Sequence, residues 1–253
     1  MKKPTKRDYY QAPQWSASAV KAMLSCEAAA AAGFEQPSST ALLVGSFVDA
    51  ALDGKRSYDE FVTKHPEIFN SRTGELKADF RQAEAMVERA KNDPVFMQYC
   101  KGERQKIFVG EIGGLPFKAK LDFYQKGKRI VDLKTTRDFA PVWTEDRGKV
   151  SFADAYYYPL QMAIYQELAR QNTGDTLPCY LACITKQDPP DIALIEIPQE
   201  RMDLEMDSLK DILPRLNAIR SGAIEPHRCG HCRYCRQTKK ITKPIRLEEL
   251  NYV

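Results

Sequence analysis

The segment from residue 105 to residue 135 constrains the fold of this chain more than any other. Two stretches, KAKLD and VDLKTT, alternate charged and apolar residues on either side of a turn at Gly127. Alternation with a period of two predicts strands that each have one apolar and one charged face. Together with the turn residues it predicts an antiparallel meander of three strands, at residues 105–110, 115–124 and 129–135.

Two acidic residues and a lysine lie on the charged faces of this meander. Asp132 and Lys134 are two residues apart and point to the same side of one strand, and Asp122 lies on the charged face of the strand before it. The turn lets Asp122 and Asp132 approach each other, which provides two oxygen ligands suited to Mg²⁺ or Mn²⁺. Phosphodiester hydrolysis needs an activated water and charge stabilisation, and a metal with a lysine supplies both. The alternative is a hairpin whose polar face is simply solvated.

Helices and further strands surround the meander in the sequence. Helical periodicity is found at residues 16–34 and from Thr40 through ALLVGSFVDAAL. It is found again at residues 77–100, with an interruption at Asp93 and Pro94, and in YYYPLQMAIYQELARQ. A last helix is predicted at residues 202–219, with a kink or break expected at Pro214. Residues 180–185 and 192–197 are predicted strands, and residues 144–149 a polar loop.

Basic residues gather in two places. Lys118 and Lys120 are expected to face the same way as Asp122, where they could meet phosphates; the alternative is an ordinary solvated charge run. The tail from residue 221 onward is also basic, but the whole chain has only 38 basic against 34 acidic residues. That balance is compatible with a polyanionic partner and does not by itself indicate one.

The cysteines indicate a metal rather than disulfides. The chain has neither a signal peptide nor an apolar run long enough to cross a membrane, so a cytoplasmic location with reduced thiols is expected. Cys229, Cys232 and Cys235 form a C-x2-C-x2-C run that can wrap one metal centre if a fourth ligand is present. Cys100, Cys179 and Cys183 are predicted to be small core residues.

Four short motifs follow one another along the chain: GSFVD at 45–49, KAKLD at 118–122, VDLKTT at 131–136 and QMAIY at 161–165. This ordered set resembles the PD-(D/E)XK nuclease superfamily, and more narrowly the phage and prophage exonucleases similar to the RecE nuclease domain. The resemblance implies that Asp122 and Asp132 bind the metal and that Lys134 positions or polarises the attacking water. It further implies that Gln161 and Tyr165 orient the DNA backbone.

The sequence departs from that family at three positions. Leu121 replaces the proline before the first acidic residue, Asp132 stands where glutamate is commoner, and Asp49 stands where many relatives have histidine. Asp49 is expected to be a third metal ligand, since a carboxylate suits Mg²⁺ at least as well as an imidazole does.

A second resemblance concerns the cysteine run. Nucleases similar to the CRISPR-adaptation family and to the AddB subunit pair one N-terminal cysteine with three C-terminal ones around a [4Fe-4S] cluster, which implies Cys26 as the fourth ligand here. The spacing of the run differs from theirs, and Zn²⁺ with His227 or His231 as the fourth ligand is the competing interpretation. Either metal would hold the tail, residues 221–240, on the predicted helix at 16–34.

These observations lead to one expectation with two alternatives. We expect a single nuclease domain over residues 1–253, with an α/β fold of the restriction-endonuclease-like type: a mixed sheet flanked by helices and a metal-bound, cysteine-rich C-terminal tail. Its expected activity is Mg²⁺-dependent exonucleolytic cleavage of linear double-stranded DNA in phage-type recombination or end processing. Because no Walker A loop is present, ATP-driven translocation is not expected.

The family resemblance permits a homo-oligomeric ring and a phage single-strand annealing protein as partners besides DNA. One alternative is a non-catalytic DNA-binding protein with a zinc-bound tail. The other is a four-cysteine nuclease of the CRISPR-adaptation type, with either endonuclease or exonuclease activity.

Overall fold

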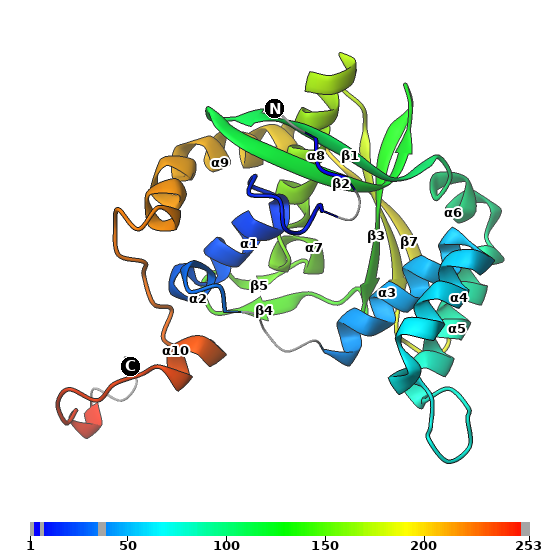
Figure 1. Cartoon of the computed structure of the whole chain (residues 1–253), viewed down its shortest axis with the longest axis horizontal. Helices are drawn as coiled ribbons and strands as arrows, with labels where there is room; N and C mark the ends of the chain where they lie inside the picture. The colour runs from blue at the N-terminus through cyan, green and yellow to red at the C-terminus, as the bar shows by residue number, and fades with distance from the viewer. Residues whose placement is uncertain (1–2, 6–7, 35–38, 249–253) are drawn as a thin grey trace.

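The computed structural model describes residues 3–5, 8–34 and 39–248, and its centre is a five-stranded sheet (Figure 1). The strands of this sheet are β1 (Glu103–Ile112), β2 (Leu115–Gln125), β3 (Arg129–Thr136), β6 (Cys179–Thr185) and β7 (Ile192–Ile197). A separate two-stranded ribbon consists of β4 (Val142–Thr144) and β5 (Gly148–Val150). The helices are α1 (Ala17–Ser25), α2 (Glu27–Ala31), α3 (Thr40–Asp53), α4 (Lys55–Lys64), η1 (Pro66–Ile68), α5 (Ala78–Lys91), α6 (Pro94–Tyr99), α7 (Phe152–Ala155), α8 (Tyr158–Thr173), α9 (Gln199–Arg220) and α10 (Arg233–Gln237).

The sheet is mixed, in the order β1-β2-β3-β6-β7. β1, β2 and β3 form the predicted antiparallel meander, and α8 then returns the chain so that β6 lies parallel to β3. β7 closes the sheet antiparallel to β6. The predicted α/β fold with a mixed sheet flanked by helices is therefore confirmed.

Helices cover both faces of this sheet. On one face α1, α8 and α9 bury a core that includes Val20, Ile164 and Leu213. On the other face α3 and α5 bury a second core that includes Phe47 and Met86. β3 lies between these two layers and has strands on both sides, so its side chains are covered on each face.

The coverage of β3 changes the meaning of its charged face. Sequence alternation predicted a charged face, with a solvated face as the alternative; in the structure Asp132 is only 2% exposed because α8 lies over it. Val131 and Leu133 point to the other side and pack with α3 and α5. A carboxylate and a lysine are therefore held inside the protein, where burial is unfavourable unless they have partners.

Local sequence explains where the helices near the site begin and end. The hydroxyl of Ser16 accepts a hydrogen bond from the amide of Ala19 and caps α1, and Ser39 caps α3 in the same way through Leu42. Pro159 stands in the first turn of α8, where a missing amide proton costs nothing, and Gly174 ends that helix at φ 83°.

The structure differs from the expectations at four elements. The helix expected at 16–34 is divided at Cys26, which has an extended backbone (φ −167°, ψ 108°) between α1 and α2. The expected loop at 144–149 is part of the β4–β5 ribbon. α4 was not predicted, and its apolar side chains Tyr58, Phe61 and Val62 are only partly buried against the second core. Of the kink or break expected at Pro214, the break is wrong: α9 is continuous through the proline, and Leu213 and Leu216 on either side of it are buried.

Among the described residues, the helices are all too short or too polar to span a lipid bilayer.

Candidate active site

Asp122 and Asp132 meet where the pairing of β2 with β3 ends. The last paired residues are Phe123 and Val131, and the next step in the same register brings Asp122 opposite Asp132. Instead of a backbone carbonyl, the carboxylate of Asp122 accepts a hydrogen bond from the amide of Leu133, with 3.0 Å between Oδ2 and N. The two strands therefore separate at this point, and their acidic side chains occupy the opening.

Four of the predicted residues form one connected network. Nε2 of Gln161 donates hydrogen bonds to Oδ1 of Asp132 at 3.0 Å and to the hydroxyl of Tyr165 at 3.2 Å. The ammonium of Lys134 forms an ion pair with Oδ2 of Asp132. Within the described part of the chain, no hydrogen bond of good geometry reaches that same Oδ2. One oxygen of Asp132 is thus held by an amide, while the other faces only a cationic neighbour.

The electrostatics of the site are those of crowded buried charges. Burial, together with the negative charge of Asp132, raises the pKa of Asp122 to about 8. Burial by itself lowers the pKa of Lys134, but the charges of Asp132, Tyr158 and Asp122, together with the contact to Asp132, outweigh burial, and the net pKa is raised. Lys134 is therefore a permanent cation at neutral pH, and Asp122 carries a proton there unless another cation is present.

Asp49 lies beside this network and has its own partner. Its Oδ1 pairs with the guanidinium of Arg104 at 2.6 Å, and the same guanidinium pairs with Asp53 at 2.8 Å. The charge of Asp49 is nevertheless among the causes that raise the pKa of Asp122, so the two carboxylates lie within electrostatic reach.

The GSFVD motif has a physical basis in helix packing. A side chain at Gly45 would place its Cβ 3.3 Å from the hydroxyl oxygen of Thr135, next to Lys134 on β3. A Cβ at this distance is tighter than an ordinary contact, so glycine lets α3 approach β3 without a shift of Thr135. Gly45 therefore brings the turn of α3 that carries Asp49 toward the site.

Three further residues contact the site but belong to none of its sequence motifs: Lys21, Gln105 and Tyr158. Lys21 on α1 donates to Oε1 of Gln161 at 2.7 Å, Gln105 on β1 donates to Oδ1 of Asp122 at 3.2 Å, and the ring of Tyr158 lies 4.6 Å from the ammonium of Lys134. One signal was available, because Lys21 is the only charged residue of α1. The other contacts depend on how distant elements pack, which local patterns do not show.

The expectation that Lys118 meets phosphates is wrong. Lys118 is 4% exposed, and its ammonium donates to the carbonyl oxygens of Tyr9 and Ala12. The segment before α1 therefore covers this part of β2. Lys120 is half-buried, and its ammonium contacts the hydroxyl of Tyr10 at 2.8 Å.

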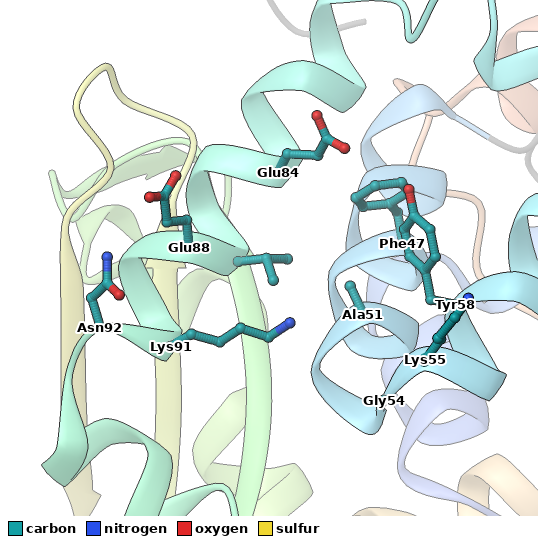
Figure 2. A pocket seen from close by; sticks show the side chains of 10 residues that line it. Phe47, Ala51, Gly54, Lys55, Tyr58, Glu84, Glu88, Lys91 and Asn92 are labelled. Atoms are coloured by element: carbon teal, nitrogen blue, oxygen red, sulfur yellow. The ribbon is translucent and has the colours of Figure 1, made fainter.

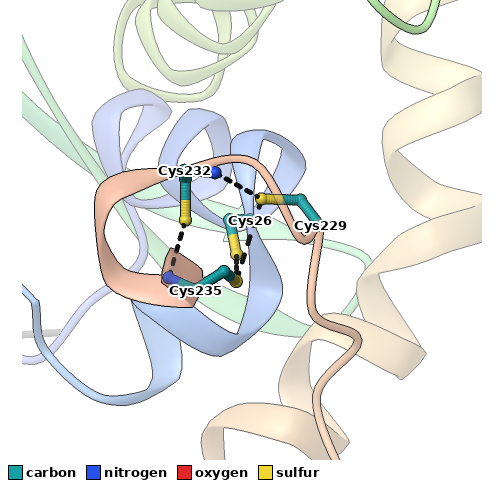
Figure 3. A group of neighbouring side chains, drawn as sticks. All are labelled: Cys26, Cys229, Cys232 and Cys235. Atoms are coloured by element: carbon teal, nitrogen blue, oxygen red, sulfur yellow. Dashed lines mark hydrogen bonds between the residues drawn. The ribbon is translucent and has the colours of Figure 1, made fainter. Parts of the chain in front are cut away.

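The structure brings four cysteines together at the other end of α1 (Figure 3). Their sulfur atoms all lie within 4.8 Å of one another, with 3.6 Å between Cys26 and Cys235 and 3.9 Å between Cys229 and Cys235. The amide of Cys232 donates to the sulfur of Cys229, as is suitable for a thiolate. The extended backbone at Cys26 is what turns its thiol toward the tail.

The histidines of the tail have other partners. Nδ1 of His231 pairs with Glu145 in the β4–β5 ribbon at 2.8 Å, and the amide of His227 donates to Glu27 of α2 at 2.7 Å. The predicted core cysteines are buried: Cys100, Cys179 and Cys183 are 7%, 0% and 0% exposed.

A pocket of different character lies between α3, α4 and α5 (Figure 2). Phe47, Tyr58 and Val87 supply its apolar wall, and Glu88 and Lys91 lie at its edge. It belongs to the layer on the far side of the sheet from Gln161 and shares no described residue with the acidic network. The buried charged groups Asp122, Asp132 and Lys134, and not this pocket, have the features of a reactive site.

The carboxylates of Asp122 and Asp132 fit a hard divalent cation. Asp122 and Asp132 offer carboxylate oxygens from two adjacent strands, and Oδ2 of Asp132 lacks a well-formed hydrogen bond within the described residues. Burial, and then the charge of Asp132, raises the pKa of Asp122, so a cation bound between the two carboxylates would favour their charged form. Mg²⁺ and Mn²⁺ prefer such oxygen donors.

Comparison with known proteins agrees with this geometry. Residues 16–238 match the family described as "PDDEXK-like domain of unknown function (DUF3799)". The chain is 36% identical to a protein from Eubacterium rectale that bears the name "Putative exonuclease", whose crystal structure superposes with a TM-score of 0.90 over 99% of this chain and 98% of that one.

Other comparisons add little. A solved structure named SSO0001 is 16% identical over 70% of this chain and 87% of its own, and its TM-score of 0.30 is too low to carry an argument. No curated protein matches the sequence. The family match and the fold together show that this chain belongs to the PDDEXK-like domain family and thus to the PD-(D/E)XK nuclease superfamily.

Proposed function

We propose that this nuclease hydrolyses DNA phosphodiesters with Mg²⁺ or Mn²⁺ held by Asp122 and Asp132, and with Asp49 as a third ligand. The observation that carries the proposal is the pair of carboxylates in the opening between β2 and β3, one of them with a pKa raised to about 8. A bound divalent cation would stabilise both carboxylates in their charged form and would supply a polarised water for attack on phosphorus.

The surrounding residues have separate roles in this proposal. Because the raised pKa of Lys134 keeps it protonated, it acts as a cation that polarises the attacking water and stabilises charge on the phosphate, and not as a general base. Gln161 holds Oδ1 of Asp132, so that Oδ2 is turned toward Lys134 and the reaction centre. Tyr165 accepts from Gln161 and extends the same network toward the DNA backbone.

We propose exonucleolytic, ATP-independent action on linear double-stranded DNA, in phage-type recombination or end processing. The support is the motif order of the sequence and the likeness to a protein named for exonuclease activity, which is 36% identical over nearly the whole chain. A homo-oligomeric ring that works beside a phage single-strand annealing protein is the assembly that this function suggests. Light scattering of the purified protein tests the ring.

The test compares two DNA substrates of the same sequence, one linear with a label at its end and one covalently closed. With Mg²⁺ the wild type is expected to degrade the linear form alone and to stop when EDTA is added. Asp132→Asn and Lys134→Met should each lower the rate about 100- to 1,000-fold. Asp207→Asn, at an exposed acidic residue of α9, is the matched control and should cleave like the wild type.

Three results would argue against this assignment in different ways. Cleavage of the closed circle would indicate an endonuclease, as in the CRISPR-adaptation type. Binding of DNA without cleavage in either metal would indicate a non-catalytic DNA-binding protein. Equal activity of wild type, Asp132→Asn and Lys134→Met would mean that the network is not the active site.

For the four-cysteine cluster we propose zinc in preference to a [4Fe-4S] cluster. Thiolates bound at about 2.3 Å to one tetrahedral zinc stand about 3.8 Å apart. The distances of 3.6 Å and 3.9 Å between sulfur atoms here support one shared ion. In a [4Fe-4S] cluster each thiolate binds its own iron at a separate corner, which holds the sulfur atoms farther apart. Cys26 rather than a histidine is the proposed fourth ligand.

A further inference from the structure

Lys21 carries a half-buried ammonium group that the proposed chemistry does not use. It lies on α1, whose other residues are uncharged and which packs on α8 and the sheet through Ala17, Val20 and Met23. Its Nζ lies 2.7 Å from Oε1 of Gln161, closer than any other polar contact of that amide. Burial, and then the positive charge of Lys134, lowers the pKa of Lys21 to about 8. A lysine at this place therefore costs stability, which indicates a role other than packing.

The amide of Gln161 can adopt two orientations that differ by exchange of its oxygen and nitrogen. In the structure Oε1 accepts from Lys21 at 2.7 Å and from Lys134 at 3.5 Å. Nε2 donates to Asp132 and to Tyr165. The opposite orientation would aim Oε1 at the carboxylate of Asp132 and place amide hydrogens against two ammonium groups. The two lysines that contact Oε1 thus favour the orientation in which Nε2 donates a hydrogen bond to Asp132.

Of the two lysines, Lys21 contributes the shorter and better hydrogen bond. At 3.5 Å, the contact of Lys134 with Gln161 is at the limit of a hydrogen bond, and Lys134 also forms the ion pair with Asp132. When Lys21 is removed, the amide oxygen keeps only the 3.5 Å contact with Lys134, so the Gln161 side chain is held less firmly and can swing away from Asp132. Asp132 would then lose its only side-chain donor among the described residues other than Lys134, and its carboxylate could rotate.

We propose that Lys21 is a positioning residue of the active site: it fixes the orientation of the Gln161 amide and, through it, the carboxylate of Asp132 that receives the metal. This inference rests on the proposed metal-dependent function. Lys21 itself contacts neither metal nor DNA in this scheme. Groups that orient a metal ligand typically contribute about 10- to 100-fold to metal affinity or activity.

The test measures Mn²⁺ binding without DNA as well as cleavage. In Lys21→Met the half-saturating Mn²⁺ concentration should rise and kcat should fall, each about 10- to 100-fold, with the KM for DNA nearly unchanged. Lys21→Arg, which keeps a donor, should recover most of both. Lys210→Met on the exposed face of α9 is the matched control, and thermal unfolding checks that each variant is folded.

A double-mutant cycle shows whether Lys21 acts through Gln161. In a Gln161→Met background, the further change Lys21→Met should have almost no effect on Mn²⁺ affinity; additive effects would overturn the inference. A rise in the KM for DNA with unchanged kcat and Mn²⁺ affinity would also overturn it, because Lys21 would then contact phosphate. If Lys21→Met does not fold, Lys21→Gln replaces it in the same cycle.

The binding measurement keeps this inference separate from the proposed function. Should the wild type bind Mn²⁺ but cleave no DNA, the proposed nuclease activity fails. A loss of Mn²⁺ affinity in Lys21→Met would still support the role of Lys21, and an unchanged affinity would refute it.

Discussion

The carboxylate of Asp122 accepts a hydrogen bond from the backbone amide of Leu133, at 3.0 Å, just beyond the last pair of the β2–β3 ladder, Phe123 with Val131. The side chain of one strand thus satisfies a backbone donor of its neighbour that the separation of the strands would leave unpaired. The same contact fixes Asp122 beside Asp132. The site is therefore built into the point where the sheet opens.

Proton and metal should compete for Asp122. Its pKa of about 8, raised by burial and by the charge of Asp132, means that a cation has to displace a proton at neutral pH. Mn²⁺ affinity is expected to rise up to about tenfold per pH unit from about pH 6 to pH 8 and to level off above. Calorimetric titrations across this range measure it, and an affinity that does not change with pH would contradict it.

The same pKa predicts how stability depends on pH in metal-free protein. The pKa of Asp122 is about 8 in the folded state against 3.8 for an ordinary aspartate, so the folded state binds the proton more tightly. Its contribution to stability is present below about pH 4 and is lost as the pH rises to about 8. Thermal unfolding in EDTA should show this loss for the wild type. Asp122→Asn, which cannot ionise, should show a smaller loss, and equal slopes would contradict the argument.

Replacing Arg104 should reveal whether Asp49 binds metal. Arg104→Met removes the cation from Asp49 and Asp53, and the half-buried carboxylates should then destabilise the metal-free protein by about 1–2 kcal/mol. If Asp49 is a ligand, Mn²⁺ should raise the unfolding temperature of this variant more than that of the wild type. Arg129→Met on β3, which removes an arginine over the ring of Tyr99, is the control. Equal shifts in both proteins would exclude Asp49 as a ligand.

Enlarging Gly45 should impair the site from a distance. A Cβ there would lie 3.3 Å from the hydroxyl of Thr135, so Gly45→Val should push α3 away from β3 and cost about 1–3 kcal/mol of the free energy of unfolding. Activity should fall as well, because Thr135 adjoins Lys134. Ser46→Val, at the exposed next position of the same helix, controls for β-branching in a helix. Urea denaturation and cleavage rates measure both effects, and identical results for the two variants would refute the packing argument.

Removing Cys26 should empty the cysteine cluster. We expect about one zinc per chain in the wild type, no broad absorbance near about 400 nm, and loss of most of the zinc in Cys26→Ser. Elemental analysis and visible spectra of anaerobically purified protein decide this. Cys100→Ala, at a buried cysteine far from the cluster in the fold, should retain its zinc. Iron with acid-labile sulfide in the wild type would overturn the assignment of zinc.

The sequence by itself determined the order of the strands in the meander, the main helices and the motif residues of the site. Its period-two alternation placed Asp132 and Lys134 on one side of β3, because residues two apart on a strand point to the same face. The register of the β2–β3 hairpin also followed from its turn at Gly127. These features are local, so short-range patterns were sufficient to find them.

Only the tertiary structure decided how buried the site is and which distant residues complete it. Sequence alternation predicted the charged face of β3 but not what covers it; α8 lies over this face, and β3 itself lies in the middle of the sheet. Lys21 and Gln161 are 140 residues apart, and Cys26 and Cys235 are 209 apart, yet each pair is in contact. Such contacts arise from the packing of α1 on α8 and of the tail on α2. No periodicity within one segment encodes them, since they depend on how separate apolar faces are buried together.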